Sequence, residues 1–331
     1  MLRWGILGTS FISDTMAAAI ASSEGSCIAA VAGRDTGRLQ AFADRHAVSR
    51  NYTNYDLLYD DADIDIIYVG LPNNVHHEAV IKAAARGKPV LSEKSLTTTM
   101  TDAEALADAV RTSGIFFLEG LMYLSHPIIA ELGMITRSGR LGTVRSVSGL
   151  YAADIWQVVN PQGNGTLFNL GCYPASLLHY VIQTAFGPNA FRQRATHGFG
   201  NRSSKDGNIC DAALSVRFGN GVLATLQSTD SYGMAFEFSV YGDKGSARFK
   251  TNPWLPVAGD NVIELSTYDG KTEDIVVSTG LDAFQHQVHT VEHCLSDGYS
   301  QAPRPSPRLE DSLEIMSLLT EWEGHCARPR R

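Results

Sequence analysis

A glutamate and a lysine at the end of a predicted buried strand are the first residues that could do chemistry. Glu93 and Lys94 close the apolar run that begins at Pro89. The amino group of a lysine in such a place can bind a substrate hydroxyl and help to move a proton. An isolated lysine at a strand end is more often a solvated charge, so this interpretation depends on the residues around it.

Asn169 and Tyr173 form a second candidate pair. They are four residues apart at the start of a helix that we expect over Asn169–Gln183, so they would share one face of it. A tyrosine hydroxyl can exchange a proton with a substrate, whereas a neutral amide can orient a hydroxyl but is no base. An ordinary half-buried tyrosine would show the same spacing. Trp156, in the loop before this helix, could close over a ligand or only pack.

A turn near the N-terminus has the setting of a phosphate-binding loop. It lies between an expected strand, Leu2–Leu7, and an expected helix, Phe11–Ser22. Helix N–H groups in that setting can hold a pyrophosphate. Against the pattern G-x-G-x-x-G, Ser10 and Ser13 replace the second and third glycines, so the motif by itself is weak. The residues expected to line this part of a dinucleotide site are Gly8, Thr9, Ser10, Phe11 and Ile12.

The turn after the second expected strand bears on which dinucleotide would bind. NAD sites usually place an acidic side chain there, on the ribose 2′-OH. This chain has Gly33 followed by Arg34, with Arg38 one helical turn later. Two guanidinium groups suit a 2′-phosphate, which a carboxylate would repel, so NADP(H) is preferred and NAD(H) stays possible. In the alternative, both arginines are surface charges and Asp35 turns inward to bind NAD(H).

Alternating strands and helices over residues 1–121 would position these side chains. Near-continuous apolar strands separated by helices predict a Rossmann domain, a doubly wound parallel sheet with helices on both faces. Ligands of such sheets bind at the carboxyl ends of the strands, where the candidate residues lie. The expected strands are Leu2–Leu7, Cys27–Ala32, Ile64–Gly70, Pro89–Glu93 and Ile115–Glu119. The expected helices are Phe11–Ser22, Thr36–His46, Val75–Arg86 and Thr101–Thr112.

Residues 122–331 have a different pattern, which predicts a second domain of α+β type. Consecutive strands with a hairpin signal at Gly219-Asn220-Gly221 indicate a large, mostly antiparallel sheet. The expected strands are Val144–Tyr151, Ala212–Phe218, Val222–Ser228, Phe236–Gly242 and Ser246–Lys250. The expected helices are His126–Ser138, Asn169–Gln183, Asp282–Ser296 and Leu309–His325, of which the last could pack back on the first domain.

Composition excludes several classes of protein. A net charge of −8 argues against a nucleic-acid binder, and no apolar run in the 331 residues approaches the length of a membrane span. The five cysteines are scattered and form no C-x-x-C pair, which favours reduced thiols and a cytoplasmic location over a disulfide framework or a metal site.

Four motifs in their order along the chain resemble the glucose–fructose oxidoreductase, inositol dehydrogenase and MocA family, written Gfo/Idh/MocA. They are Pro72-Asn73-Asn74-Val75-His76, Glu93-Lys94-Ser95, Glu119-Gly120-Leu121-Met122-Tyr123 and the stretch from Gly165 to Pro174. The pattern is most similar to members of the dimeric dihydrodiol and xylose dehydrogenase type. The resemblance implies an enzyme that transfers hydride between nicotinamide and a secondary alcohol or ketone of a sugar, polyol or related compound.

The resemblance also implies roles for particular residues. Lys94 and Tyr173 would be the acid/base pair, with the positive charge of Lys94 favouring the tyrosinate, and Asn169, Lys94 and Trp156 would bind substrate. The second domain would bind substrate and carry the sheet through which a homodimer or homotetramer forms. Beyond the N-terminal turn, the cofactor residues would be Arg34, Arg38, Leu71, Pro72, Asn73, His76, Glu93 and Lys94.

Two departures from the family pattern keep other functions open. Ser95 replaces the usual proline after the lysine, which could relax the turn that aims Lys94, and Asn169 replaces a usual aspartate. Such changes could accompany loss of catalysis, so one alternative is a catalytically silent dinucleotide-binding sensor or regulator. Another is a family member that uses its nucleotide to assist the cleavage of a glycoside.

Overall fold

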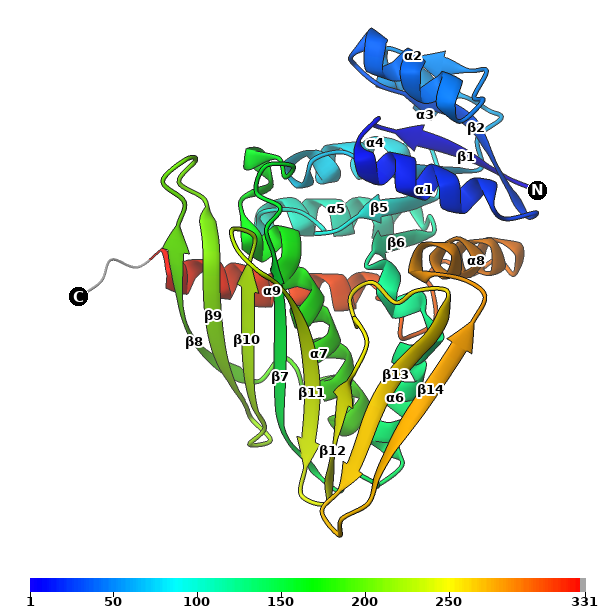
Figure 1. The fold of residues 1–331 in the computed structure, drawn as a ribbon. Coiled ribbons are helices and arrows are strands. Elements are labelled where there is room, and N and C mark those ends of the chain that lie inside the picture. Colours follow the sequence, from blue (N-terminus) through cyan, green and yellow to red (C-terminus); the bar gives the residue numbers. More distant parts are fainter. Residues whose placement is uncertain (328–331) are drawn as a thin grey trace. The chain divides into compact units, whose positions relative to one another are not determined.

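The computed structural model describes residues 1–327, and each of its two units is built on one sheet (Figure 1). The first unit comprises Met1–Met122 and Phe284–Leu313; the second comprises Tyr123–Ala283 and the chain from Glu314 onward. The sequence predicts one boundary, after residue 121, and a second domain over residues 122–331 whose last helix could pack back on the first. The structure instead returns residues 284–313 to the first unit.

The first unit contains a six-stranded sheet in the order β3-β2-β1-β4-β5-β6. All neighbouring strands in it are parallel, so the predicted Rossmann architecture is confirmed. The sequence did not predict β3 or the short helix α3 (Tyr55–Asp60), because two residues carry no readable alternation. The strands are β1 (Leu2–Leu7), β2 (Ser26–Ala32), β3 (Asn51–Tyr52), β4 (Ile66–Val69), β5 (Val90–Glu93) and β6 (Phe117–Gly120).

Helices around this sheet close one hydrophobic core. Val288 and Val291 of α8 are fully buried in the same cluster as Trp4 of β1 and Tyr68 of β4. The Glu292 carboxylate accepts hydrogen bonds from two serine hydroxyls at the start of β2. These contacts explain why a segment so late in the sequence belongs to the first unit. The other main helices are α1 (Phe11–Ala21), α2 (Thr36–Arg45), α4 (His76–Ala84) and α5 (Met100–Ser113), and α8 spans Ala283–Ser296.

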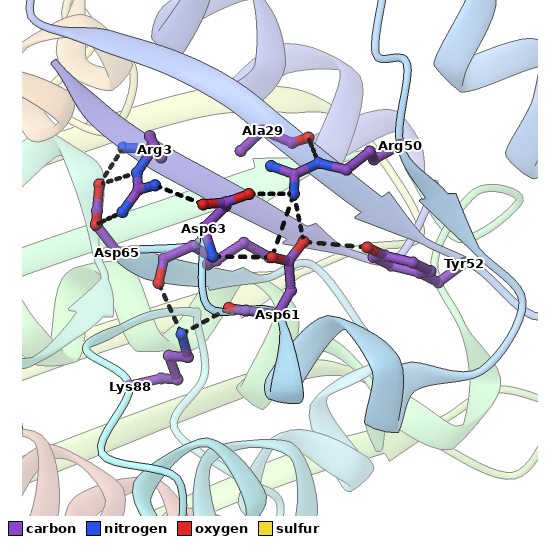
Figure 2. A network of polar contacts seen from close by, with 9 residues as sticks. Arg3, Ala29, Arg50, Tyr52, Asp61, Asp63, Asp65 and Lys88 are labelled. Carbon is purple, nitrogen blue, oxygen red and sulfur yellow. Dashed lines mark hydrogen bonds and ion pairs between the residues drawn. The ribbon is translucent and has the colours of Figure 1, made fainter.

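The amino ends of the parallel strands are joined by a network of ion pairs and hydrogen bonds (Figure 2). Arg3 of β1 binds Asp65, which directly precedes β4, through its Nη2 (2.7 Å), and Arg50 binds Asp63 (2.8 Å). The Lys88 amino group donates to the backbone oxygens of Asp61 and Ile64 at 2.7 and 2.8 Å. The charged side chains at this edge are paired with one another or with backbone oxygens, so the edge stabilises the fold. Ligands of a parallel sheet bind at the opposite edge, where the strands have their carboxyl ends.

The second unit contains an eight-stranded sheet in the order β14-β13-β12-β11-β7-β10-β9-β8. The neighbouring strands β7 and β10 are parallel, and the other pairings recorded in it are antiparallel. The predicted mostly antiparallel sheet is therefore confirmed. Three strands were missed, β8, β13 and β14, because much of their sequence is polar on both faces. The strands are β7 (Val144–Ala153), β8 (Arg194–Arg202), β9 (Ile209–Phe218), β10 (Leu223–Thr229), β11 (Met234–Gly242), β12 (Gly245–Phe249), β13 (Gly259–Thr267) and β14 (Thr272–Thr279).

Helices cover one face of this sheet. Helix α7 (Cys172–Phe186) packs against β7 and β10, and α6 (Pro127–Arg137) packs against α7 and β13. A π-helical turn, Leu167–Gly171, leads into α7 where the sequence predicts an α-helix from Asn169. The last helix, α9, spans Leu309–Cys326. Among the helices of residues 1–327, none is both long and apolar enough to cross a membrane.

Candidate active site

The N-terminal turn is built so that only glycine suits position 8. Gly8 has φ +106°, and a Cβ there would lie 2.7 Å from the backbone oxygen of Gly70 at the end of β4. The Ser10 hydroxyl donates to that same oxygen (3.1 Å) and accepts from the Ser13 N–H (3.4 Å), which caps α1. The turn is therefore tied to the neighbouring strand end, with the N-terminus of α1 held beside it.

Ser13 stands at the third glycine of the pattern G-x-G-x-x-G, and α1 still packs closely on the end of β4. Its side chain is fully buried, and a Cβ on Gly70 would lie only 2.3 Å from the Ser13 Oγ. The small residue at this crossing is thus Gly70 rather than residue 13. Gly70 was missed as a site residue; the available signal was a glycine that ends an apolar strand.

Asp35 lies between β2 and α2, and its side chain caps α2. Its carboxylate accepts a hydrogen bond from the Arg38 N–H (2.9 Å) and caps α2, and this bond lowers its pKa. The Arg38 guanidinium lies 3.6 Å from the same carboxylate and is largely exposed, as is Arg34. The inward-turned Asp35 of the alternative interpretation is not the conformation that the structure has.

Glu93 and Lys94 lie together at the carboxyl end of β5. The buried Glu93 carboxylate accepts from the Tyr68 hydroxyl (2.9 Å) and from the Lys94 N–H (3.3 Å). Burial raises the pKa of Glu93, while the charge of Lys94 and the Tyr68 hydrogen bond oppose that rise. Lys94 is half-buried, and its peptide bond to Ser95 is cis.

His76 joins two of the strand-end loops. Its ring is fully buried, with Nδ1 2.9 Å from the Ser95 oxygen and Nε2 2.8 Å from the Leu71 oxygen. Burial lowers the pKa of His76, and its hydrogen bonds with the backbone of Leu71 and Ser95 oppose that decrease. Its position makes it a residue that holds the loops, next to the half-exposed Pro72 and Asn73.

Glu119 is a buried carboxyl that sequence reasoning did not select. It ends β6, directly beside Ser92 of β5, and is 2% exposed. Burial raises its pKa to about 7, the nearby Ser312 side chain and the Leu96 backbone oppose this rise, and the charge of Glu93 adds to it. The signal in the sequence was a carboxylate inside an otherwise apolar strand.

In the second unit, Tyr173 lies in a cluster of aromatic rings. Its ring centroid is 5.2 Å from that of Tyr151, 5.6 Å from Tyr123 and 6.2 Å from Trp254. The Tyr123 hydroxyl lies 3.0 Å from the Tyr173 backbone oxygen and 2.6 Å from the Ser176 hydroxyl. Burial raises the pKa of Tyr151 to about 12, so this neighbour stays neutral. Tyr173 is thus held by aromatic packing and by the hydroxyl groups of Tyr123 and Ser176 at its backbone oxygen.

Asn169 has different surroundings, although it is only four residues away. Because Leu167–Gly171 is a π-helical turn, this spacing is not the regular helical repeat that the sequence suggested. Asn169 lines a cavity of about 290 Å³ with Trp156, Lys205 and Asp230. Trp156 is 39% exposed, and the Lys205 amino group lies 2.9 Å from the centre of its ring.

Two family models match most of the chain in succession. The model described as "Oxidoreductase family, NAD-binding Rossmann fold" matches residues 2–120, and the GFO/IDH/MocA C-terminal domain model matches residues 129–248. D-xylose 1-dehydrogenase (NADP(+)) 2 of Haloferax volcanii is 32% identical over 96% of this chain and 95% of its own length. The chain belongs to the Gfo/Idh/MocA oxidoreductase family. It is accordingly an NAD(P)-dependent oxidoreductase that acts on CH–OH groups.

Other family members and solved structures agree with this assignment. Trans-1,2-dihydrobenzene-1,2-diol dehydrogenase of Bos taurus is 26% identical over 97% of this chain and 95% of its own. A 3-ketoreductase from Actinomadura kijaniata has the same fold, with a TM-score of 0.84, 23% identity and 98% of each chain covered. The aldose-aldose oxidoreductase from Caulobacter crescentus also shares the fold, with a TM-score of 0.82, 21% identity and coverage of 98% and 97%.

Proposed function

We propose that this Gfo/Idh/MocA protein transfers hydride between NADP(H) and a secondary alcohol or ketone of a sugar, a polyol or a related hydroxylated compound. The names of two relatives support this substrate class. The Haloferax enzyme is a D-xylose dehydrogenase that uses NADP(+), and the bovine enzyme is a dehydrogenase of a trans-1,2-diol. Both align with nearly the whole of this chain.

The position of Asp35 is the observation that carries the NADP(H) preference. A carboxylate that binds the ribose 2′-OH would have to face the cofactor, but this one accepts a hydrogen bond from its own helix. Arg34 and Arg38 on the same turn are exposed and positively charged. Guanidinium groups bind phosphate well, so we assign them to the 2′-phosphate.

The donor set of the first unit fits a dinucleotide. The tight turn at Gly8 and the capped start of α1 place N–H groups at a helix N-terminus, which suits a pyrophosphate. Thr9, Ser10, Phe11 and Ile12 would share in that contact. The loop Leu71–Asn73 and the pair Glu93 and Lys94 would line the nicotinamide end, while His76 holds those loops together. When bound, the nicotinamide supplies or accepts the hydride.

We assign the proton chemistry to Lys94 and Tyr173. The Tyr173 tyrosinate would take the proton of a substrate hydroxyl during oxidation, and the hydroxyl so formed would return it during reduction. Lys94 would bind the same substrate oxygen and favour the tyrosinate by its positive charge. Each residue is positioned by contacts within its own unit. The Lys94 N–H donates to Glu93, and the Tyr173 ring packs against Tyr123, Tyr151 and Trp254.

The test is turnover of sugars and polyols with NADP⁺ and with NAD⁺ by wild type, Lys94→Met and Tyr173→Phe. Loss of general acid–base catalysis predicts a fall in kcat of about 100- to 10,000-fold in each variant, with the Kd for NADPH within a few-fold of wild type. Lys271→Met and Tyr268→Phe are matched controls, because both side chains are exposed on the second unit. Full activity of Lys94→Met and Tyr173→Phe would refute the assigned roles, and equal kcat/KM with NAD⁺ would refute the cofactor preference.

We further propose that the protein is a homodimer or homotetramer formed through the uncovered face of the eight-stranded sheet. Large side chains on that face are exposed, among them Phe199 (70%), Leu223 (55%) and Tyr241 (39%). A second copy of this face would cover them. Light scattering should give a multiple of the 35.9 kDa chain mass, and Phe199→Glu should lower it. A monomeric wild type would contradict this assembly.

We place the protein in the cytoplasm. All five cysteines are free thiols in the structure, and Cys172 and Cys294 are buried. Free thiols persist in a reducing compartment. Fractionation of the source cells, with detection by a specific antibody, tests this location, and recovery from a secreted or periplasmic fraction would contradict it.

A further inference from the structure

Asp230 is a buried carboxylate in the second unit to which the assigned chemistry gives no role. It directly follows β10, which pairs in parallel with β7, and is 3% exposed. Its backbone N–H donates to the Cys210 oxygen (3.1 Å), and its backbone oxygen accepts from the N–H groups of Ile155 and Trp156 at 3.1 and 3.0 Å. The main chain therefore holds Asp230 firmly at the junction of three segments.

The turn that carries Asn169 is attached to the same strand end. The Thr166 and Ser228 hydroxyls are 2.7 Å apart, and Ser228 also donates to the Thr166 oxygen at 3.2 Å. On the other side, Gly165 has φ +81°, and a Cβ there would lie 2.3 Å from the Ile209 oxygen. Only glycine allows this approach, which draws the π-helical turn against β9 and β10.

As a result the side chains of Asn169 and Asp230 meet at the cavity wall. Both line the cavity of about 290 Å³ together with Trp156, and the Asn169 amide lies close enough to the Asp230 carboxyl group to lower its pKa. Asn169 cannot act as a base, but the carboxylate that this position lacks is present beside it. A carboxylate has two oxygens that can accept two hydroxyl groups at once, and an amide can both donate and accept.

We propose that Asp230 and Asn169 bind a vicinal diol of the substrate, with the Asp230 carboxylate accepting hydrogen bonds from two adjacent hydroxyl groups. Asp230 is then the residue that makes the enzyme select polyhydroxylated substrates over simple alcohols, and the indole of Trp156 supplies an apolar wall for the carbon skeleton. This inference deepens the proposed function and rests on it for the class of substrate.

The ionisation of Asp230 gives the proposal a pH signature. Burial raises the pKa of Asp230 to about 6, and the nearby Asn169 amide opposes this rise. Below that pH the carboxyl group is protonated and accepts fewer hydroxyl groups, so the KM for a diol substrate should rise as pH falls from 7 to 5. The other ionisable side chains that line the cavity are Arg202, Lys205, Asp206 and Cys210.

The main test compares wild type with Asp230→Asn, using D-xylose, D-glucose and their 2-deoxy and 3-deoxy analogues with NADP⁺. Hydrogen bonds to a charged group contribute about 1.5–3 kcal/mol, so the KM for the parent sugar should rise about 10- to 150-fold. The KM for NADP⁺ should not change. At least one deoxy analogue should bind poorly to wild type, and Asp230→Asn should raise its KM less than that of the parent sugar, because it lacks one of the two hydroxyl groups that the carboxylate binds.

Asp211→Asn is the matched control. Asp211 lies on the neighbouring strand β9, where it is opposite Thr229 of β10, and it hydrogen-bonds to Asn201 and Tyr232. The variant Asp211→Asn makes the same chemical change one strand away. The KM for each sugar should therefore stay within about two-fold of wild type at every pH. An Asp230→Asn effect that is the same for the parent sugar and for all deoxy analogues would show a structural role only and overturn the proposal.

The wild type alone provides a second measurement if Asp230→Asn does not fold. A sugar KM that is constant from pH 7 to pH 5 would overturn the proposal. Should wild type bind NADP⁺ but oxidise no sugar, the proposed function fails, and calorimetric binding of D-xylose and D-glucose then decides the diol site separately. Binding by wild type that Asp230→Asn weakens supports the diol site, and no binding of either sugar overturns it.

Discussion

The cofactor edge of the first unit and the cavity of the second unit are built in different ways. In the first, the loops that carry Gly8, Arg34, His76 and Lys94 each follow a strand of one parallel sheet. In the second, Asn169 lies on a turn before a helix, and Asp230 ends a strand about sixty residues later. A repeated strand–turn–helix unit places its ligand residues predictably, whereas a mixed sheet places them wherever its connections return.

The largest effect that would separate the two regions is expected at Gly8. Ala in its place would put a Cβ 2.7 Å from the Gly70 oxygen at a φ of +106°. Strain of about 3 kcal/mol predicts a loss of NADPH affinity of about 100-fold, measured by fluorescence titration. Gly87→Ala is the control, because Gly87 also has positive φ (+65°) but nothing within 4 Å of its Cβ position. Equal effects of the two changes would mean that the close approach to β4 is unimportant.

Glu119→Gln tests whether the stability of the first unit depends on a buried carboxyl group that was not among the predicted site residues. A carboxyl whose pKa is raised to about 7 binds its proton more tightly in the folded state. Its contribution to stability is complete below the unfolded pKa, about 4.5, and is lost as pH rises through 7. Urea unfolding should show wild type losing about 1–3 kcal/mol relative to the variant between pH 5 and pH 8. Parallel pH profiles of the two proteins would contradict this account.

Arg34→Ser and Arg38→Ser would sharpen the cofactor side of the comparison. Each should raise the KM for NADP⁺ about ten-fold and leave the KM for NAD⁺ within two-fold, because only NADP⁺ carries the phosphate that the guanidinium binds. Arg45→Ser is the control, because Arg45 is an exposed arginine on α2, the helix that carries Arg38, and it pairs with Asp14 of α1. A proportional loss with both nucleotides would point to damage to α2 instead.

The smallest effect is expected at Tyr123 in the second unit. Tyr123→Phe removes a hydroxyl that contacts the Tyr173 backbone oxygen and Ser176 but keeps the ring. The loss of a buried hydrogen bond of about 1 kcal/mol predicts a small decrease in Tm and a few-fold decrease in kcat. A kcat effect as large as that of Tyr173→Phe would mean that Tyr123 itself takes part in proton transfer.

Much of the first unit could be predicted because its signals are local. Apolar strands, capped helices and a turn with glycine and serine lie next to one another in the chain, and the parallel sheet follows from their alternation. Short β3 and α3 escaped because two to six residues carry too little periodicity. The strands β8, β13 and β14 escaped because their polar residues hide the alternation of buried and exposed positions.

The sequence by itself determined the family and the parallel sheet, and it predicted the strand ends to which we assign the cofactor, because each depends on residues close together in the chain. Only the tertiary structure showed that Gly70 makes room for Ser13, that Asp35 caps its own helix, and that residues 284–313 complete the first core. It alone brought Asp230 to Asn169. Contacts of this kind depend on how distant segments pack, and burial then sets the ionisation of the groups that meet.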